Sequence, residues 1–177
     1  TLTGRKLTIS GGITGLIMTM YSNDYWQYTS QAFKDAFAGD GALFLRLADF
    51  YNDRNDDGTY ASNMLEANMA VSCLDGRSVA TTAAMKAQNA RLIKMSPFFG
   101  RYWQNGALGC EQWPYPVAAH PKSYAATGSG PIVVVGTTGD PATPYTDAVA
   151  LANEVLENAQ LITWNGEGHT AYGQGST

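Results

Sequence analysis

A short apolar run near the carboxyl end of the chain constrains the fold more than any other stretch. The run PIVVVG, from Pro131 to Gly136, is rich in β-branched residues and bounded by Pro and Gly, which predicts a strand buried on both faces. The segment TTGDPATPY follows and places Asp140 just past the carboxyl end of that strand. A second short strand, Gln160–Trp164, precedes a Gly-rich loop that contains His169. Because a helical pattern separates the two strands, we expect a parallel pair with an acid and a histidine within hydrogen-bond reach.

The helix between these strands has clear signals at its start. Thr143 is a suitable N-cap, Pro144 is the favoured first helical residue, and Asp147 suits the positive end of the helix dipole. Two parallel strands by themselves would leave apolar edges and faces exposed, so we expect them to belong to a larger sheet. The apolar stripe of the helix consists of Ala148, Leu151, Ala152 and Val155.

Composition excludes several classes of protein. The chain has 177 residues, of which 45% are hydrophobic and 15% charged, as in a globular protein with one or two packed units. A net charge of -4 and 11 scattered Lys and Arg residues argue against a nucleic-acid partner. No apolar run approaches the roughly 20 residues that span a bilayer, and the amino terminus TLTGRKLTIS lacks the apolar region of a signal peptide. We therefore expect no nucleic-acid surface and no membrane span.

The residues before the first strand show helical periodicity and then lose it. In the third expected helix, ALFLRLADFY, capped by Asp40, the spacing of Leu43, Leu47 and Phe50 predicts one buried face. From Pro97 to Pro131 the sequence is rich in Gly, Pro and aromatic residues and predicts irregular structure. The other expected helices are Thr8–Tyr21, a helix capped by Asn23 or Asp24 that ends at Phe37, Ser62–Val71 and Val79–Met95.

Two features bear on metals and cofactors. The acidic turn from Asp53 to Gly58 matches the first half of a calcium loop, but the twelfth position, which needs a bidentate Glu, is Met64, so we expect a solvated turn. Cys73 and Cys110 are too few for a zinc cluster and lack C-x-x-C spacing. They are either two buried thiols or one structural disulfide. The sequence predicts no metal site and no cofactor.

The carboxyl-terminal residues resemble a known family. Strand, acid, helix, strand and histidine is the order in which an α/β-hydrolase presents the last two members of its Ser, Asp and His triad. The segments PIVVVGTTGDPATPY and LITWNGEGHTAYGQGS resemble the TAP-like carboxyl-terminal part of secreted actinobacterial tripeptidyl aminopeptidases and their SlpD/SlpE-like relatives, which are serine peptidases. Upstream, GDGALFLRLADFY, AVSCLD and CEQWP extend the resemblance over nearly the whole chain.

The resemblance implies an α/β chain with a partial α/β-hydrolase fold, in which residues 1–130 form a mainly helical cap and residues 131–177 form the last β-α-β unit of the sheet. It implies that Asp140 is the triad acid and His169 the triad base. It also implies a disulfide between Cys73 and Cys110 and a protein that is secreted or associated with the cell envelope.

The nucleophile of that family is absent from the 177 residues. The family's serine sits in a G-x-S-x-G elbow, and no such sequence occurs here; Ser10 and Ser129 lack the spacing. We therefore expect a fragment whose missing amino-terminal half carries the serine, and a chain that is inactive alone.

The resemblance implies a peptide substrate with a free amino terminus, and a carboxylate in the cap would recognise its ammonium group. Asp75 and Glu66, on either side of Cys73, are candidates, although either could be a solvated surface charge. Trp113, with Trp103 and Tyr115, could line a substrate cleft or simply pack. Two alternatives to a serine aminopeptidase are a non-catalytic cap or binding module and another α/β-hydrolase such as an esterase.

Overall fold

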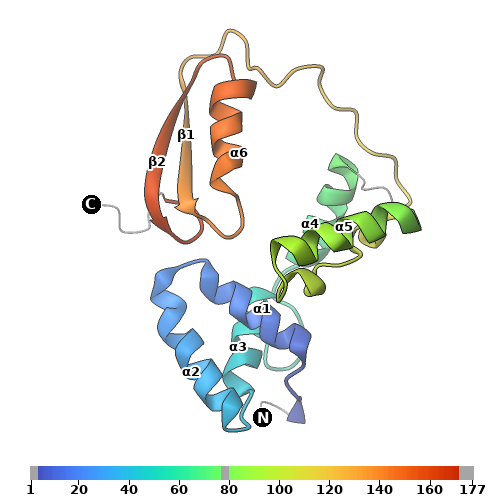
Figure 1. Cartoon of the computed structure of the whole chain (residues 1–177), viewed down its shortest axis with the longest axis vertical. Helices are drawn as coiled ribbons and strands as arrows, with labels where there is room; N and C mark the ends of the chain where they lie inside the picture. Colours follow the sequence, from blue (N-terminus) through green and yellow to red (C-terminus); the bar gives the residue numbers. More distant parts are fainter. Residues whose placement is uncertain (1–3, 77–79, 172–177) are drawn as a thin grey trace. The chain divides into compact units, whose positions relative to one another are not determined.

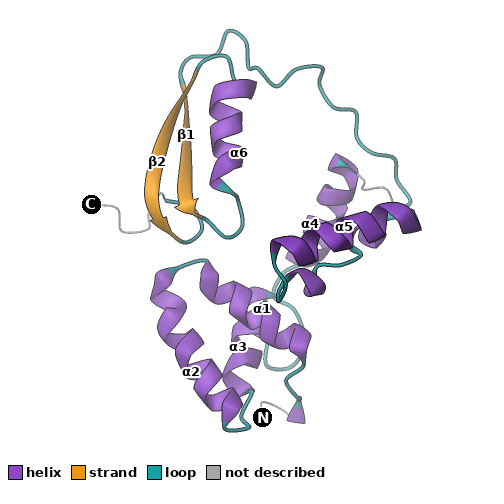
Figure 2. Cartoon of the chain, viewed as in Figure 1, coloured by secondary structure: helices purple, strands orange, loops and turns teal. Residues whose placement is uncertain are grey.

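The computed structural model describes residues 4–76 and 80–171 and divides the chain into two compact units (Figure 1). The first unit combines Thr1–Thr59 with Pro121–Thr177, and the second is Tyr60–His120. Helices dominate both units, and the only strands among the described residues form one parallel pair in the first unit (Figure 2). None of the described helices has the length and apolar character needed to cross a membrane.

The amino-terminal part of the first unit is a group of three packed helices, α1 (Ile9–Met20), α2 (Trp26–Phe37) and α3 (Ala42–Tyr51). The Thr8 hydroxyl caps α1 by accepting the Gly11 N–H, and the Asp40 carboxylate accepts the Ala42 N–H at the start of α3. The helix expected after Asn23 begins instead with a 3-10 turn, Asn23–Tyr25, capped by the Ser22 hydroxyl.

The core of this helical group lies where α1, α2 and α3 meet. A Cβ on Gly15 would lie 2.6 Å from the Phe44 carbonyl oxygen, so glycine allows α1 to approach α3 closely. The expected buried face of α3 is partly wrong, because Phe50 is 66% exposed. The side of α3 that meets the other helices is rotated by about one residue relative to the predicted side. Phe44 is therefore buried and Phe50 is not. The buried core residues are Met18, Ala32, Phe44 and Leu47.

The carboxyl-terminal part of the first unit is the β-α-β arrangement. Strand β1 (Ile132–Gly139) pairs in parallel with β2 (Ala159–Glu167), and the two are connected through α6 (Tyr145–Ala150) and a π-helical turn, Leu151–Val155. Both strands are longer than expected, and β1 therefore ends directly before Asp140. The parallel pairing expected from the crossover is confirmed.

Helix α6 begins one residue later than the sequence signals predict. Pro144 is the N-cap rather than the first helical residue, and Thr143 makes no cap because its hydroxyl donates to the Asp140 carboxylate at 2.8 Å. The expectation that β1 is buried on both faces is also wrong. Helix α6 covers the face that carries Gly136, whereas Val133 and Val135 on the other face are 55% and 46% exposed.

The second unit contains α4 (Met64–Asp75) and α5 (Thr82–Met95), followed by a loop with two 3-10 turns, Gly100–Tyr102 and Gly106–Cys110. The expected helix Ser62–Val71 thus starts later and runs further, and the expected start of the next helix at Val79 lies outside the described residues. The Asn89 and Asn105 amides bind each other, with an Asn89 Nδ2 to Asn105 Oδ1 distance of 2.9 Å, which attaches the loop to α5.

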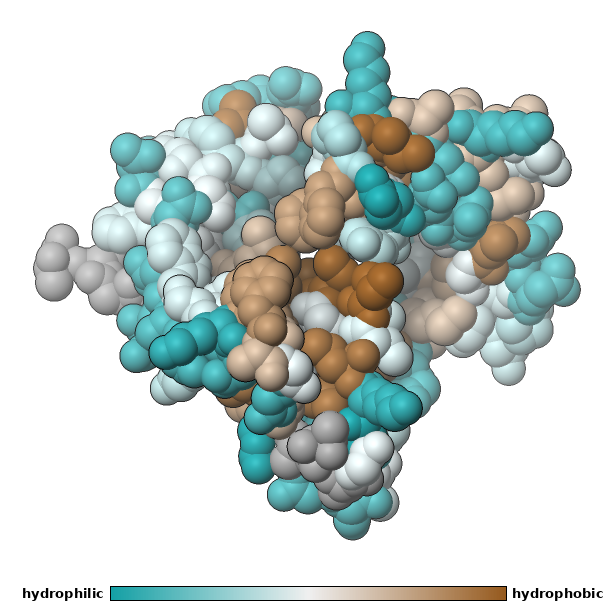
Figure 3. Space-filling model, turned by 60° about the horizontal axis from the view of Figure 1, so that its bottom comes forward, coloured by the Kyte–Doolittle hydropathy of each residue, from teal (hydrophilic) through white to brown (hydrophobic). Residues whose placement is uncertain are grey.

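A disulfide joins Cys73 of α4 to Cys110 of the loop, as the resemblance implies. Cys73 is fully buried. Large apolar side chains are exposed in both units, among them Phe37 and Met95. In Figure 3 hydrophobic residues, in brown, are visible at the surface between hydrophilic ones.

We predict that removing this disulfide destabilises the second unit. Its cysteines are separated by 37 residues, and closing a loop of that size stabilises a fold by about 4 kcal/mol in the loop-entropy model. Hydrogen exchange of the full-length protein with Cys73→Ser and Cys110→Ser should show faster exchange in 60–120, with α1–α3 as the internal reference. Two free thiols in unreduced protein expressed in an oxidising compartment, seen by mass spectrometry, would contradict the pairing.

Candidate active site

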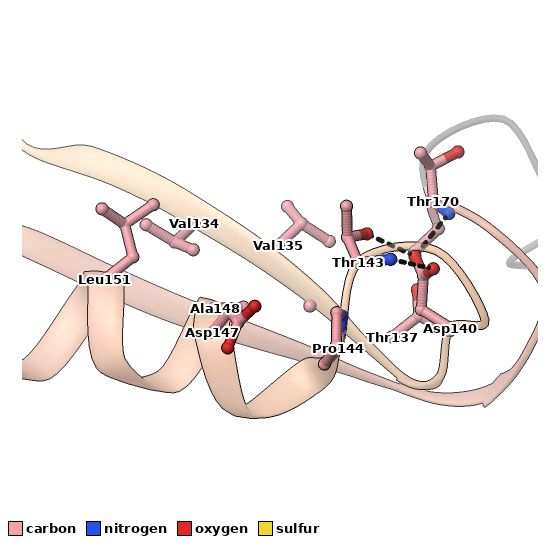
Figure 4. Close-up of a pocket in the computed structure, with 12 residues that line it drawn as sticks. Val134, Val135, Thr137, Asp140, Thr143, Pro144, Asp147, Ala148, Leu151 and Thr170 are labelled. Atoms are coloured by element: carbon pink, nitrogen blue, oxygen red, sulfur yellow. Dashed lines mark hydrogen bonds between the residues drawn. The ribbon is translucent and has the colours of Figure 1, made fainter. Parts of the chain in front are cut away.

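Asp140 follows the carboxyl end of β1, and the next turn of the chain folds back over its carboxylate. Oδ1 accepts the backbone N–H groups of Ala142 and Thr143, each at 2.8 Å. The Thr143 hydroxyl donates to Oδ2 at 2.8 Å (Figure 4). An Asp whose side chain binds the backbone two and three residues ahead is typical of a turn before a helix. These contacts fix the carboxylate at the edge of the sheet.

His169 lies just past the carboxyl end of β2, in a loop that needs special backbone angles. Gly168 has a φ of 103° and Thr170 a φ of 64°. A Cβ on Gly168 would lie 2.9 Å from the Tyr21 carbonyl oxygen, so glycine is suited to this position on both counts. The Thr170 N–H donates to Asp140 Oδ2 at 3.1 Å, which joins the two loops (Figure 4).

The structure brings Asp140 and His169 together, at the distance that the sequence led us to expect. His169 Nδ1 lies 3.0 Å from both Oδ1 and Oδ2 of Asp140. Because an ionised carboxylate only accepts, Nδ1 carries the proton in this hydrogen bond. The Asp140 side chain is 3% exposed and that of His169 is 29% exposed. The acid is therefore buried beneath an imidazole that solvent can still reach.

Hydrogen bonding controls the charge of the Asp140 carboxylate. Burial alone raises its pKa, but the N–H groups of Thr143, Ala142 and Thr170, together with His169, outweigh that effect and hold the pKa well below its ordinary value. The carboxylate is consequently ionised throughout the neutral range and can fix the tautomer of His169.

Tyr21, at the end of α1, is a neighbour of the pair that sequence reasoning missed. Its carbonyl oxygen accepts the His169 N–H at 2.8 Å, and its ring meets the imidazole edge to face with centroids 5.1 Å apart. A hydrogen bond with Tyr51, burial, and the charges of Tyr51 and Asp140 raise the pKa of Tyr21 to about 12. No local signal marks Tyr21, because its contact depends on how α1 packs beside a loop far along the chain.

A cavity of about 320 Å³ adjoins the pair on the α6 side of β1 (Figure 4). Among its lining residues, Thr137 has a buried hydroxyl for which no hydrogen-bond partner exists within the described residues. An unsatisfied buried hydroxyl is costly, so a further polar group is expected to approach here. The other lining residues include Val134, Val135, Asp140, Thr143, Ala148, Leu151 and Thr170.

Residues 96–177 match the model of the family described as TAP-like protein. The matched segment belongs to the TAP-like family. Its β-α-β unit is accordingly the last part of an α/β-hydrolase fold.

Three relatives illustrate the range of names among the proteins that this chain is similar to. Serine protease Hip1 of Mycobacterium tuberculosis is 35% identical over 176 residues, which cover 98% of this chain and 33% of that protein. Carboxylesterase B of the same species is 38% identical over 176 residues, covering 97% and 33%. The tripeptidyl aminopeptidase of Streptomyces lividans is 31% identical over 166 residues, covering 86% and 30%. The chain thus spans about a third of the length of the curated relatives it matches.

The remaining candidate residues lie in the second unit, outside the Asp140 and His169 pair. Glu66 is in the first turn of α4 and Asp75 is its last residue, and both are exposed. Trp113 lies beside Tyr115, with ring centroids 6.1 Å apart. The described residues contain no group of three or more His, Cys, Asp or Glu side chains placed to hold a metal.

We predict a pH signature for the Asp140 contacts. Because the folded pKa lies below the unfolded value of about 4, the ionised carboxylate stabilises the fold fully above that value and loses this effect as pH falls toward the folded pKa. In a His169→Ala background, which removes the titration of the imidazole, Asp140→Asn should lower Tm by a constant amount above about pH 5 and by less below about pH 4.

The matched control is Asp56→Asn, which changes an exposed carboxylate and should shift Tm little at any pH. A Tm difference for Asp140→Asn that grows as the pH falls from 5 to 3 would contradict the assignment of a lowered pKa.

Proposed function

We propose that Asp140 and His169 are the acid and the base of a Ser, His and Asp triad in a serine hydrolase that acts on peptides. The observation that carries this proposal is the hydrogen bond between His169 Nδ1 and a buried, ionised Asp140. This bond fixes the tautomer in which Nε2 lacks a proton and can accept one from a serine hydroxyl.

In the proposed reaction the two residues have separate roles. Nε2 of His169 takes the proton of the serine hydroxyl as the serine oxygen attacks the peptide carbonyl, and it then returns this proton to the leaving amine. A water molecule, activated by the same nitrogen, hydrolyses the resulting ester and frees the serine. Asp140 holds the imidazole and stabilises its cationic form without taking the proton, because its pKa is low.

We further propose that the nucleophilic serine belongs to a part of the hydrolase outside these residues. Four features support this. The chain contains no G-x-S-x-G sequence, and it spans about a third of its relatives. The sheet face that carries Val133, Val135 and Ile162 is about half exposed, although such strands are normally covered on both faces. Finally, the buried Thr137 hydroxyl lines a cavity beside the triad residues.

The helical residues before β1 would act as the cap over the peptide. Division into a cap of residues 1–130 and a core of residues 131–177 stays a prediction, as do roles for Glu66, Asp75 and Trp113 in binding the substrate. The disulfide is consistent with a secreted or envelope-associated protein, because such bonds persist in oxidising compartments.

Relatives named serine protease and tripeptidyl aminopeptidase favour a peptidase that starts from a free amino terminus. A carboxylesterase is the second candidate, since a relative with that name is 38% identical to this chain. Both reactions use the same triad and differ in the leaving group.

The test uses the full-length protein with matched tripeptide amide, acetylated tripeptide amide and simple ester substrates. Asp140→Asn should lower kcat by about 10⁴-fold, because it removes the acceptor that selects the His169 tautomer. His169→Ala should do so at least as strongly. Glu154→Gln, a charge-neutralising control at an exposed position, should retain activity.

A fluorophosphonate probe adds an independent measurement. It should label one serine in a G-x-S-x-G sequence, and labelling should slow in His169→Ala. Unchanged kcat in both the Asp140 and His169 variants would refute the triad. Absence of labelling and of turnover in the wild-type protein would favour a non-catalytic binding module, and turnover of the ester alone would favour the esterase.

A further inference from the structure

A second cavity, of about 340 Å³, lies beside the Asp140 and His169 pair within the first unit. Helices α1 and α2 form one wall, and the carboxyl ends of β1 and β2 form the other. Gly139 and Pro141 flank Asp140 in sequence, and Glu167 precedes His169 by two residues. The lining residues are Leu16, Thr19, Met20, Trp26, Thr29, Ser30, Gly139, Pro141 and Glu167.

The hydroxyl groups of this cavity present oxygen lone pairs rather than protons. Thr19 donates its hydroxyl proton to the Leu16 carbonyl at 2.8 Å. Thr29 and Ser30 donate in the same way to carbonyls one helical turn earlier, at 3.5 and 3.3 Å. Because these hydroxyl protons are donated to the helix backbone, Thr29 and Ser30 offer acceptor oxygens to a ligand, whereas Thr19 is buried.

The cavity also carries one negative charge. The Glu167 carboxylate leans over Gly139, its partner in the strand register, and a Cβ at position 139 would collide with it. Glycine therefore makes the space that this carboxylate occupies. Within the described part of the chain, no Lys, Arg or His forms an ion pair with Glu167.

Apolar and aromatic groups complete the lining. Trp26 is 50% exposed and Met20 is 45% exposed, so both offer surface to a ligand. An indole ring attracts cations through its π face, and a carboxylate forms charge-assisted hydrogen bonds with ammonium or guanidinium groups. A carboxylate, hydroxyl acceptors and an indole in one cavity, with no basic residue in its lining, form a site complementary to a cation with an apolar stem.

We propose that this cavity is a substrate subsite that binds a positively charged group of the peptide, with Glu167 as its counter-charge. The charged group is either the terminal ammonium or the side chain of Lys or Arg, which share this chemistry. The inference rests on the proposed function, because the cavity can receive part of a substrate only if the scissile bond lies at His169. In this proposal the carboxylate that binds the positive charge of the substrate is Glu167, beside the triad, rather than Glu66 or Asp75.

The kinetic test measures selectivity in the full-length protein. Each substrate is compared with a neutral isostere: a free tripeptide amide with its acetylated form, and an acetylated peptide containing Lys with its norleucine analogue. In Glu167→Gln, the ratio of kcat/KM for one of these cationic substrates to that for its neutral partner should fall by about 10- to 100-fold. The pair whose ratio falls identifies the ammonium or the side chain as the bound group.

Two further variants sharpen this result. Glu154→Gln removes an equal charge at an exposed position that does not line the cavity and should leave both ratios unchanged. Trp26→Leu keeps the apolar bulk but removes the aromatic face, so it should lower the same ratio as Glu167→Gln. Equal losses for cationic and neutral substrates in Glu167→Gln, or no change in either ratio, would overturn the subsite.

A binding measurement separates this inference from the triad proposal. L-Leucinamide at a pH where its amine is charged should shift the NMR resonances of Gly139 and Gly166 in the Asp140→Asn protein, which needs no turnover. The shifts should weaken in Asp140→Asn combined with Glu167→Gln. Shifts that persist equally in the double variant would overturn the role of Glu167, whereas failure of the triad alone would leave this binding intact.

Discussion

The Asp140 carboxylate connects the loops at the carboxyl ends of the two strands in the β-α-β unit. It accepts hydrogen bonds from the turn that precedes α6, from the loop that follows β2 and from His169 itself. A buried carboxylate without such donors would be neutral or destabilising. Here the same hydrogen bonds that keep it charged also connect the ends of two strands. Stability and charge placement thus come from a single set of contacts.

The β-α-β unit could be predicted from sequence because its signals are local. β-branched residues mark β1, and Asp140 and His169 follow the strands directly, so the topology alone brings them to one edge of the sheet. The predicted start of α6 is one residue too early, for a reason that cannot be read from the sequence. Thr143 could satisfy either the helix or the acid, and the buried carboxylate competes successfully for its hydroxyl.

Contacts between distant elements could not be predicted in the same way. Tyr21 and Glu167 are part of no recognisable sequence motif. Their positions depend on the packing of α1 and α2 beside the strand ends. The burial of α3 shows the same limit, because the spacing of Leu43, Leu47 and Phe50 fits one face, whereas the packed face includes Phe44. Periodicity identifies a helix, but the neighbours decide which side of it is buried.

The contact between α1 and the histidine loop is made by main-chain atoms, the Tyr21 carbonyl and the His169 N–H. Such a contact does not depend on which side chain occupies position 21. Substitution of Tyr21 can alter the ring packing yet leave the hydrogen bond in place. Point mutants at this position would therefore underestimate how much the contact stabilises the protein. A one-residue insertion or deletion in α1 would rotate the carbonyl by about 100° about the helix axis and remove it. This part of the protein is therefore constrained in the length of α1 rather than in the type of residue at position 21.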